Sequence, residues 1–125
     1  MSKSIRIGIK DPDADDSMQE VIDAWHRAER GEPPEEPVHR IYFQDLETLL
    51  RVLSVRRLEL LKALHKAGPM NVRALAKLLG RDYKNVHQDV TRLERLGLIE
   101  RSGRRAVMVP WESISFSAEI RLAAA

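Results

Sequence analysis

The sequence predicts an α+β fold, mostly α, in which a helical core lies between two shorter strand-forming segments. Apolar residues recur at three- and four-residue spacing through residues 45–96, which is the spacing of helices with one buried face. Apolar and polar residues alternate near both ends of the chain, in Ser4–Lys10 and Ile114–Ile120, which is the period of half-buried strands. A length of 125 residues is typical of a single domain.

The first segment, residues 1–53, is predicted to be an acidic extension with β-α-β-like order. After the strand Ser4–Lys10, Asp16 or Ser17 can cap a helix that ends at about residue 30. The sequence GEPPEEP at 31–37 is predicted to be a linker, and the β-prone HRIYF that follows is predicted to be a second strand. Gln44 or Asp45 then begins another helix. The apolar stripes of the two helices are Met18, Val21, Ile22 and Trp25, and Leu46, Leu49, Leu50 and Leu53.

The middle segment, residues 54–110, is predicted to hold three helices over about 55–67, 72–79 and 83–96. Their N-caps are Ser54, Asn71 and Asp82, residue types whose side chains accept from free backbone N–H groups. A glycine follows each helix and ends it, since glycine readily adopts the conformation that a helix end requires. These glycines are Gly68, Gly80 and Gly97.

A basic hairpin follows the third helix. Its strands are predicted at Leu98–Arg101 and Ala106–Val109, around the turn Ser102-Gly103-Arg104. The last segment, residues 111–125, is predicted to be a C-terminal strand, Ile114–Ile120, and a tail. Two short helices, a tight turn, a longer basic helix and a basic hairpin are the layout of a winged helix-turn-helix, which places one helix in the major groove of DNA.

The third helix has one apolar and one polar face. Val86, Val90 and Leu93 share the core face, and the opposite pole carries no acidic residue. Asn and Gln side chains can pair with adenine, and Arg and Lys side chains with guanine. Arginines of the wing, residues 101–106, and of the turn before the third helix can reach phosphates. The arginines of the wing can also reach a minor groove. The predicted DNA-binding residues are Arg81, Lys84, Asn85, Gln88, Thr91, Arg92, Arg95, Arg104 and Arg105.

Several charged residues around this helix allow more than one interpretation. A polar helix face can simply be solvated, which is the alternative to DNA contact. Arg73 is placed near the N-terminus of the second helix, where backbone N–H groups can also bind phosphate. Arg56 and Arg57 can contact DNA or the acidic N-terminal half. Asp89 and Glu94 lie beside the core face, where they can pair with basic residues of other helices.

Charge is distributed unevenly along the chain, whose net charge is +2. Residues 1–53 hold 7 Lys/Arg and 12 Asp/Glu, a net charge of −5. Residues 54–125 hold 14 Lys/Arg and 7 Asp/Glu, a net charge of +7. The basic half, which contains the predicted helix-turn-helix, would be attracted to a polyanion, and the acidic half would be repelled.

The segment MNVRALAKLLGRDYKNVHQDVTRLERLGLIERSG resembles the DNA-binding core of MarR-like winged-helix regulators. The matching pieces are Leu75-Ala76, Gly80-Arg81-Asp82, Val86, Asp89-Val90 and the run Leu93–Ile99. Within that group the chain is most similar to small prokaryotic regulators with an N-terminal β-α-β-like extension and a strand after the wing. Some of these are antitoxins encoded beside a toxin, which the resemblance makes an option here. The long dimerising helices of full-length MarR proteins are absent from this sequence.

Other classes of protein find little support in the sequence. The absence of cysteine excludes disulfides and thiolate metal sites, and the four histidines are far apart, so we expect no metal and no cofactor. The acidic residues of 11–16 lack the glycine and closing glutamate of a calcium loop. No catalytic motif is visible, so an enzyme is not expected. We expect no secretory signal, no membrane segment and a cytoplasmic location.

Three functions remain open. The first is a sequence-specific transcription regulator, expected to be a repressor, that binds double-stranded DNA as a homodimer. The second is an antitoxin whose N-terminal half binds a toxin protein, and the third is an adaptor for protein or RNA. A dimer is expected because helix-turn-helix proteins usually read two half-sites, and the strands Ile5–Ile9 and Ile114–Ile120 are predicted to pair the subunits. The aromatic residues are predicted to be core or interface residues, with a stacked small ligand as the alternative: Trp25, Tyr42, Phe43 and Trp111.

Overall fold

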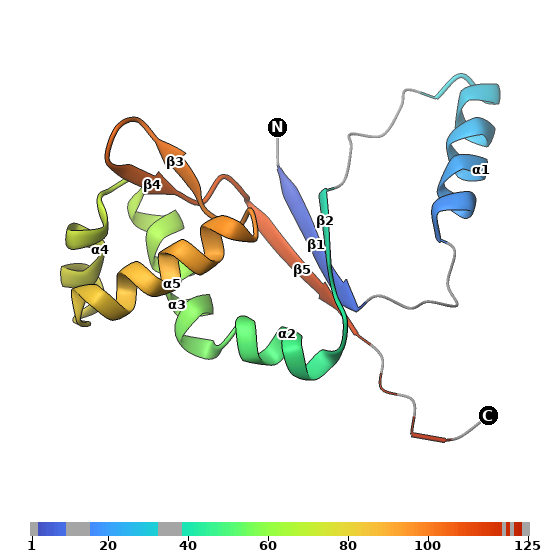
Figure 1. The fold of residues 1–125 in the computed structure, drawn as a ribbon. Coiled ribbons are helices and arrows are strands. Elements are labelled where there is room, and N and C mark those ends of the chain that lie inside the picture. Colours follow the sequence, from blue (N-terminus) through green and yellow to red (C-terminus); the bar gives the residue numbers. More distant parts are fainter. Residues whose placement is uncertain (1–2, 10–15, 33–38, 119, 121, 124–125) are drawn as a thin grey trace.

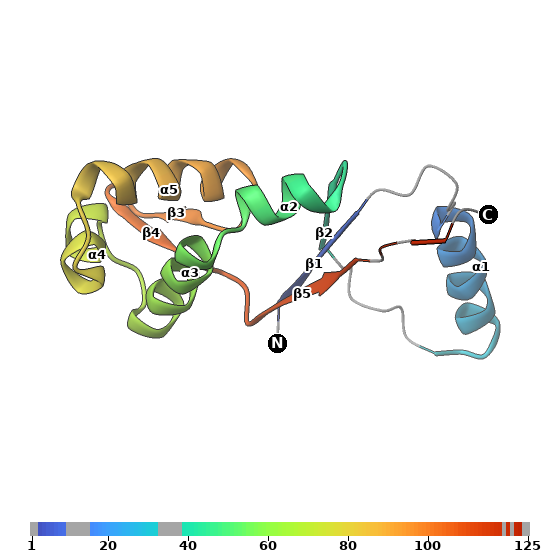
Figure 2. The ribbon, with the colours of Figure 1, turned by 90° about the horizontal axis from the view of Figure 1, so that it is seen from below.

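The computed structural model describes residues 3–9, 16–32, 39–118, 120 and 122–123, with the side chains of 16–20 left out. The fold is α+β, as predicted, and the described part contains five helices, a three-stranded sheet and a two-stranded hairpin (Figure 1). The helices α2 to α5 form one layer with the hairpin, and the three-stranded sheet lies between this layer and helix α1 (Figures 1 and 2).

The N-terminal elements occur in the predicted order. They are β1 (Ser4–Ile9), α1 (Asp16–Glu29), β2 (His39–Phe43) and α2 (Leu46–Val52). Asp45 caps α2, since its side chain accepts from the backbone N of Thr48 at 2.7 Å. Hydrogen bonds from the side chain and the backbone of Thr48 lower the pKa of Asp45. Leu50, predicted to face inward, is 60% exposed instead, because the inner face of this short helix is filled by Leu49 and Val52. Residues 10–15 and most of the predicted linker 31–37 lie outside the described residues.

The elements of the second half are α3 (Val55–Ala67), α4 (Val72–Leu79), α5 (Tyr83–Arg95), β3 (Glu100–Ser102), β4 (Ala106–Met108) and β5 (Ser113–Ser117). The three predicted N-caps are confirmed: Ser54, Asn71 and Asp82 each accept from a backbone N–H three residues later. Gly80 follows α4 in the left-handed conformation, with φ of 64°, which a residue with a Cβ atom rarely adopts.

The strands of the second half are shorter than predicted. Leu98 and Ile99 were assigned to the hairpin, but their backbone N–H groups bond to the carbonyl of Leu93 at the end of α5, and both side chains are buried in the core. The hairpin therefore begins only at Glu100. Strand β5 ends at Ser117 and not at residue 120. Its pairing with β1 also ends at Ser117, which lies opposite Gly8.

The three-stranded sheet has the order β2-β1-β5, and both pairings are parallel. Ile7 of the central strand lies opposite Ile41 on one side and Phe116 on the other. The prediction that β1 pairs two subunits is therefore wrong, because both edges of β1 are already hydrogen-bonded within the chain. Of the two strands predicted to pair subunits, only β5 keeps an edge that no described strand occupies.

One continuous core joins the sheet to the helices. Ile5 and Ile7 of β1 are almost fully buried, as are Leu60 and Leu64 of α3. Trp111, just before β5, is also buried, and its Nε1 donates to the carbonyl of Gly97 at 2.9 Å. The terminal segments are thus part of the same packed unit as α3 to α5. Of the four aromatic residues predicted to lie in the core or at an interface, Phe43 and Trp111 are in the core, whereas Tyr42 and Trp25 are exposed in the single chain.

Replacing Ile7 with alanine should lower the free energy of unfolding by about 3 kcal/mol, because it leaves a cavity at a position that is 1% exposed. Chemical denaturation followed by circular dichroism measures this change. Arg6→Ala, on the exposed face of the same strand, is the matched control and should change the free energy by less than about 0.5 kcal/mol. Equal effects of the two variants would contradict the central position of β1.

Candidate nucleic-acid interface

Helix α5 presents one face to the core and one to solvent. Val86, Val90 and Leu93 are buried, so they fix the rotation of the helix about its axis. Helix α4 packs against α5 and is joined to it by the turn 80–82 (Figure 2). The predicted base-contacting residues on the outward face that are exposed are Lys84, Asn85, Gln88, Arg92 and Arg95. The structure therefore brings these five side chains together on one accessible surface.

Thr91 differs from its neighbours on this face. Its side chain is half-buried, and its hydroxyl donates to the backbone carbonyl of His87 at 2.9 Å. The hydroxyl oxygen can still accept a hydrogen bond, but its proton is used within the helix. Thr91 is thus a weaker candidate for base contact than the adjacent Gln88.

Asp89 joins three elements through two ion pairs. Its carboxylate accepts from Nε of Arg57 at 3.1 Å and from Nη2 of Arg81 at 2.7 Å. Arg57 also donates to the carbonyl of Val52 at 2.7 Å. The Asp89 side chain is 15% exposed, and the two arginine side chains are only slightly more exposed. This arrangement confirms that Asp89 pairs with basic residues of other elements, and it locks α5 to α3 and to the α4–α5 turn.

Arg81 is consequently not placed as the sequence predicted. It was expected to contact phosphate, but its guanidinium turns inward to Asp89, and its Nη1 is buried without a hydrogen-bond partner among the described residues. Arg57, for which DNA and the acidic N-terminal half were the options, contacts Asp89 of the basic half and also the carbonyl of Val52, at the end of α2 in the N-terminal half. The physical reason is the position of Asp89 beside the core face, where an unpaired carboxylate would be costly.

The structure adds a stacked group that the sequence analysis missed. The guanidinium carbon of Arg73, in α4, lies 5.1 Å from the ring centre of Tyr83, and the ring centres of Tyr83 and His87 are 5.8 Å apart. Tyr83 and His87 are separated by four residues in α5, so a helical wheel of that segment could have shown their contact. Beside them a hollow of about 550 Å³ is lined by residues that include Asn71, Lys77 and Gly80. This hollow extends from the N-cap of α4 at Asn71, past its C-cap at Gly80, to the first residue of α5.

The hairpin lies next to α5 and carries two more exposed cations. Gly103, with φ of 72°, makes the turn between β3 and β4, and Arg104 and Arg105 follow it with exposed side chains. Arg101 is held by Glu94 of α5 at 3.1 Å, which orients the hairpin toward that helix. The backbone of Met70, before α4, pairs with Val107 on the other edge of the hairpin. The predicted wing residues therefore stand beside the outward face of α5.

The sequence model of the HVO_A0114 family matches residues 52–116, just over half of the chain. The chain belongs to the HVO_A0114 family. The HVO_A0114 match contains α3 to α5, the hairpin and most of β5, and it does not include β1, α1 or β2. No curated protein and no solved structure matches the chain.

Two other features are absent from the described part of the chain. No group of three or more His, Cys, Asp or Glu residues there is arranged to hold a metal ion. None of its helices is long and apolar enough to cross a membrane.

Replacing Asp89 with alanine should lower the free energy of unfolding by about 2–3 kcal/mol, because Arg57 and Arg81 lose their shared partner in a largely buried position. Glu94→Ala is the control on the same helix, since it removes the more exposed pair with Arg101 and should cost less than about 1 kcal/mol. Thermal and urea denaturation measure both changes. A smaller effect at Asp89 than at Glu94 would contradict the structural role of the Asp89 pairs.

Proposed function

We propose that this protein is a cytoplasmic, sequence-specific DNA-binding transcriptional regulator that acts as a homodimer and as a repressor. In this proposal residues 54–110 form a winged helix-turn-helix of the MarR-like type. Helix α5 enters the major groove, and the hairpin β3–β4 contacts the backbone or the minor groove. The acidic N-terminal half points away from the DNA.

The observation that carries the proposal is the composition of the outward face of α5. Its exposed residues near the pole are amide and cationic side chains, which are the groups that read base edges in the major groove. The carboxylates of the helix are engaged in ion pairs, because Asp89 is paired with two arginines and Glu94 with Arg101. An adaptor for another protein would not require this separation of amides and cations from carboxylates.

The supporting contacts follow from the positions of the remaining cations. Arg104 and Arg105 are exposed at the tip of the hairpin, where they can neutralise phosphates on one side of the recognition helix. On the other side, the hollow beside Tyr83 offers a second phosphate position, since the exposed cations of Arg73 and Lys77 line it. Arg81 is assigned to the Asp89 pairs and not to DNA in this proposal.

The alternative is an antitoxin that regulates its own operon and binds a toxin through its N-terminal half. The observation that favours it is the uncovered apolar face of α1, which is described below. A gene encoding a small toxin next to this one, together with a stable complex of the two purified proteins, would support this alternative.

Replacing Gln88 with alanine should remove about 1–3 kcal/mol of discrimination at particular base pairs of the operator, because the side chain can pair with an adenine edge. Arg95→Ala should act in the same way at another base pair. The measurement is fluorescence anisotropy on promoter fragments and on fragments with single base changes. The control is Arg6→Ala, which removes an exposed cation on the sheet. Wild-type binding by both α5 variants would exclude α5 as the recognition helix.

Replacing Arg104 and Arg105 together with alanine should weaken binding to all DNA sequences and leave the preference among these sequences unchanged. Two lost phosphate contacts should also reduce the slope of log K against log salt by roughly 2. Titrations at several salt concentrations measure this slope. An unchanged slope would show that the hairpin does not contact the DNA backbone.

A further inference from the structure

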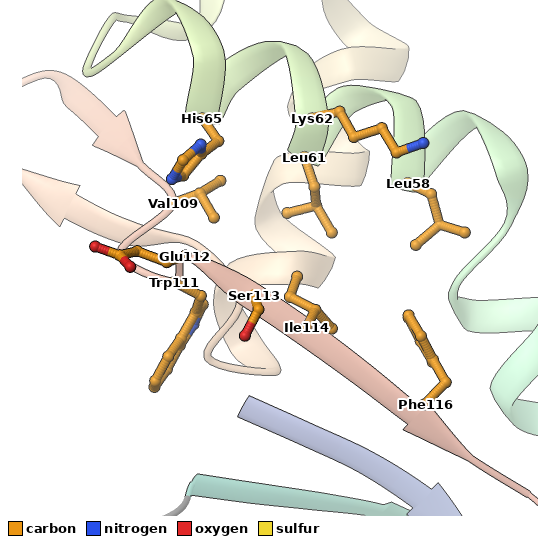
Figure 3. A pocket seen from close by; sticks show the side chains of 10 residues that line it. All are labelled: Leu58, Leu61, Lys62, His65, Val109, Trp111, Glu112, Ser113, Ile114 and Phe116. Atoms are coloured by element: carbon orange, nitrogen blue, oxygen red, sulfur yellow. The ribbon is translucent and has the colours of Figure 1, made fainter. Parts of the chain in front are cut away.

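A groove between α3 and β5 has no occupant among the described residues. It encloses about 510 Å³ (Figure 3). Its walls are largely apolar, with Leu58 and Leu61 on the helix and Trp111, Ile114 and Phe116 on the strand side. The polar residues of the lining are Lys62, His65, Glu112 and Ser113. Phe116 is 47% exposed although it belongs to the same sheet face as the buried Ile7. The cation of Lys62 lies at the rim.

Helix α1 carries an apolar surface that is also uncovered. Val21 and Trp25 are 64% and 67% exposed, and Ile22 lies beside them on the same face. Glu29 follows Trp25 by four residues, so it extends this face with a negative charge. An exposed tryptophan flanked by aliphatic residues marks an interaction site in a soluble protein.

Helix α1 does not reach the groove of its own chain in this structure. The three-stranded sheet stands between α1 and α3 in both views (Figures 1 and 2). The sheet face turned away from the core is polar, with exposed residues such as Arg6, Tyr42 and Ser115, and it does not match an apolar helix stripe.

We propose that the apolar stripe of α1 docks into the α3–β5 groove of a second copy of this chain. Trp25 is the side chain that fills the groove, between Leu58 and Phe116 of the partner. Glu29 then lies near Lys62 at the rim, so charge and apolarity match together. Two-fold symmetry makes the exchange reciprocal and covers both exposed surfaces at once. The inference rests on the homodimer of the proposed function and names its interface.

Three measurements test this interface. Sedimentation should show a dimer of about twice 14.3 kDa at micromolar concentration. The emission of Trp25, obtained as the difference between wild type and Trp25→Phe, should shift to the blue and lose iodide quenching as the dimer forms. Trp25→Ser and Phe116→Ser should each shift the protein to the monomer. Both positions are exposed in the single chain. The free energy of unfolding of each monomeric variant should therefore equal that of the wild-type monomer.

Leu50→Ser is the matched control, because Leu50 is exposed on α2 outside the groove, and this variant should remain dimeric. Mixing Trp25→Ser with Phe116→Ser should restore a heterodimer, since one intact α1 and one intact groove remain. Its dissociation constant should be at least about tenfold above that of the wild type, because one of two contacts is lost.

A dimer in which Trp25 stays accessible to iodide would overturn the interface and leave the homodimer of the proposed function standing. If both serine variants dimerised as strongly as the wild type, the interface would likewise be overturned and the homodimer would stand. A mixture of the two variants that forms no more dimer than either variant alone would also overturn the interface, because it would show that α1 and the groove do not contact each other. DNA recognition is tested separately by Gln88→Ala, so failure of this interface is distinguishable from failure of the proposed function.

Discussion

Strand β1 is hydrogen-bonded on both sides, and this constraint connects the two ends of the chain. Because both neighbours of β1 are parallel to it, each connection between strands must cross from one end of the sheet to the other. The connection from β2 to β5 contains α2 to α5 and the hairpin, so the entire candidate DNA-binding unit is an insertion between two strands of one sheet. The sheet and this unit share the core that includes Ile5, Ile7 and Leu64. Removing β1 would therefore affect both.

Within the inserted unit, Asp89 fixes the position of the outward face of α5, the candidate recognition surface. It holds Arg57 of α3 and Arg81 of the turn, and both contacts lie beside the buried face of α5. Trp111 holds the C-terminal end of the helix through the carbonyl of Gly97. Helix α5 is thus attached at its middle and just beyond its C-terminal end, which gives its exposed side chains a fixed position. Such a fixed position is what reading of base edges requires, since a hydrogen bond weakens steeply when its angle departs from linearity.

The same tryptophan connects the recognition helix to the proposed dimer interface. Trp111 contributes to the wall of the α3–β5 groove and donates to Gly97 at the end of α5. A helix that enters the groove from a second copy would contact this side chain. In a two-fold dimer the spacing between the two recognition helices would then depend on contacts at the far end of each α5. The proposed dimer interface would therefore set the spacing of the two half-sites in the proposed operator.

The sequence by itself determined the elements and the polarity of α5. Caps such as Ser54, Asn71 and Asp82 are local signals, because each side chain bonds a backbone group three residues away. The period of Val86, Val90 and Leu93 likewise determined which face of α5 is buried, and hence that Gln88 and Arg95 are exposed. The tertiary structure alone decided that Arg81 turns inward and that β1 pairs with β5 of the same chain. Arg81 and Asp89 are eight residues apart but lie in different elements, the turn after α4 and helix α5, and Ile7 and Phe116 come from opposite ends of the chain. No local pattern encodes either contact.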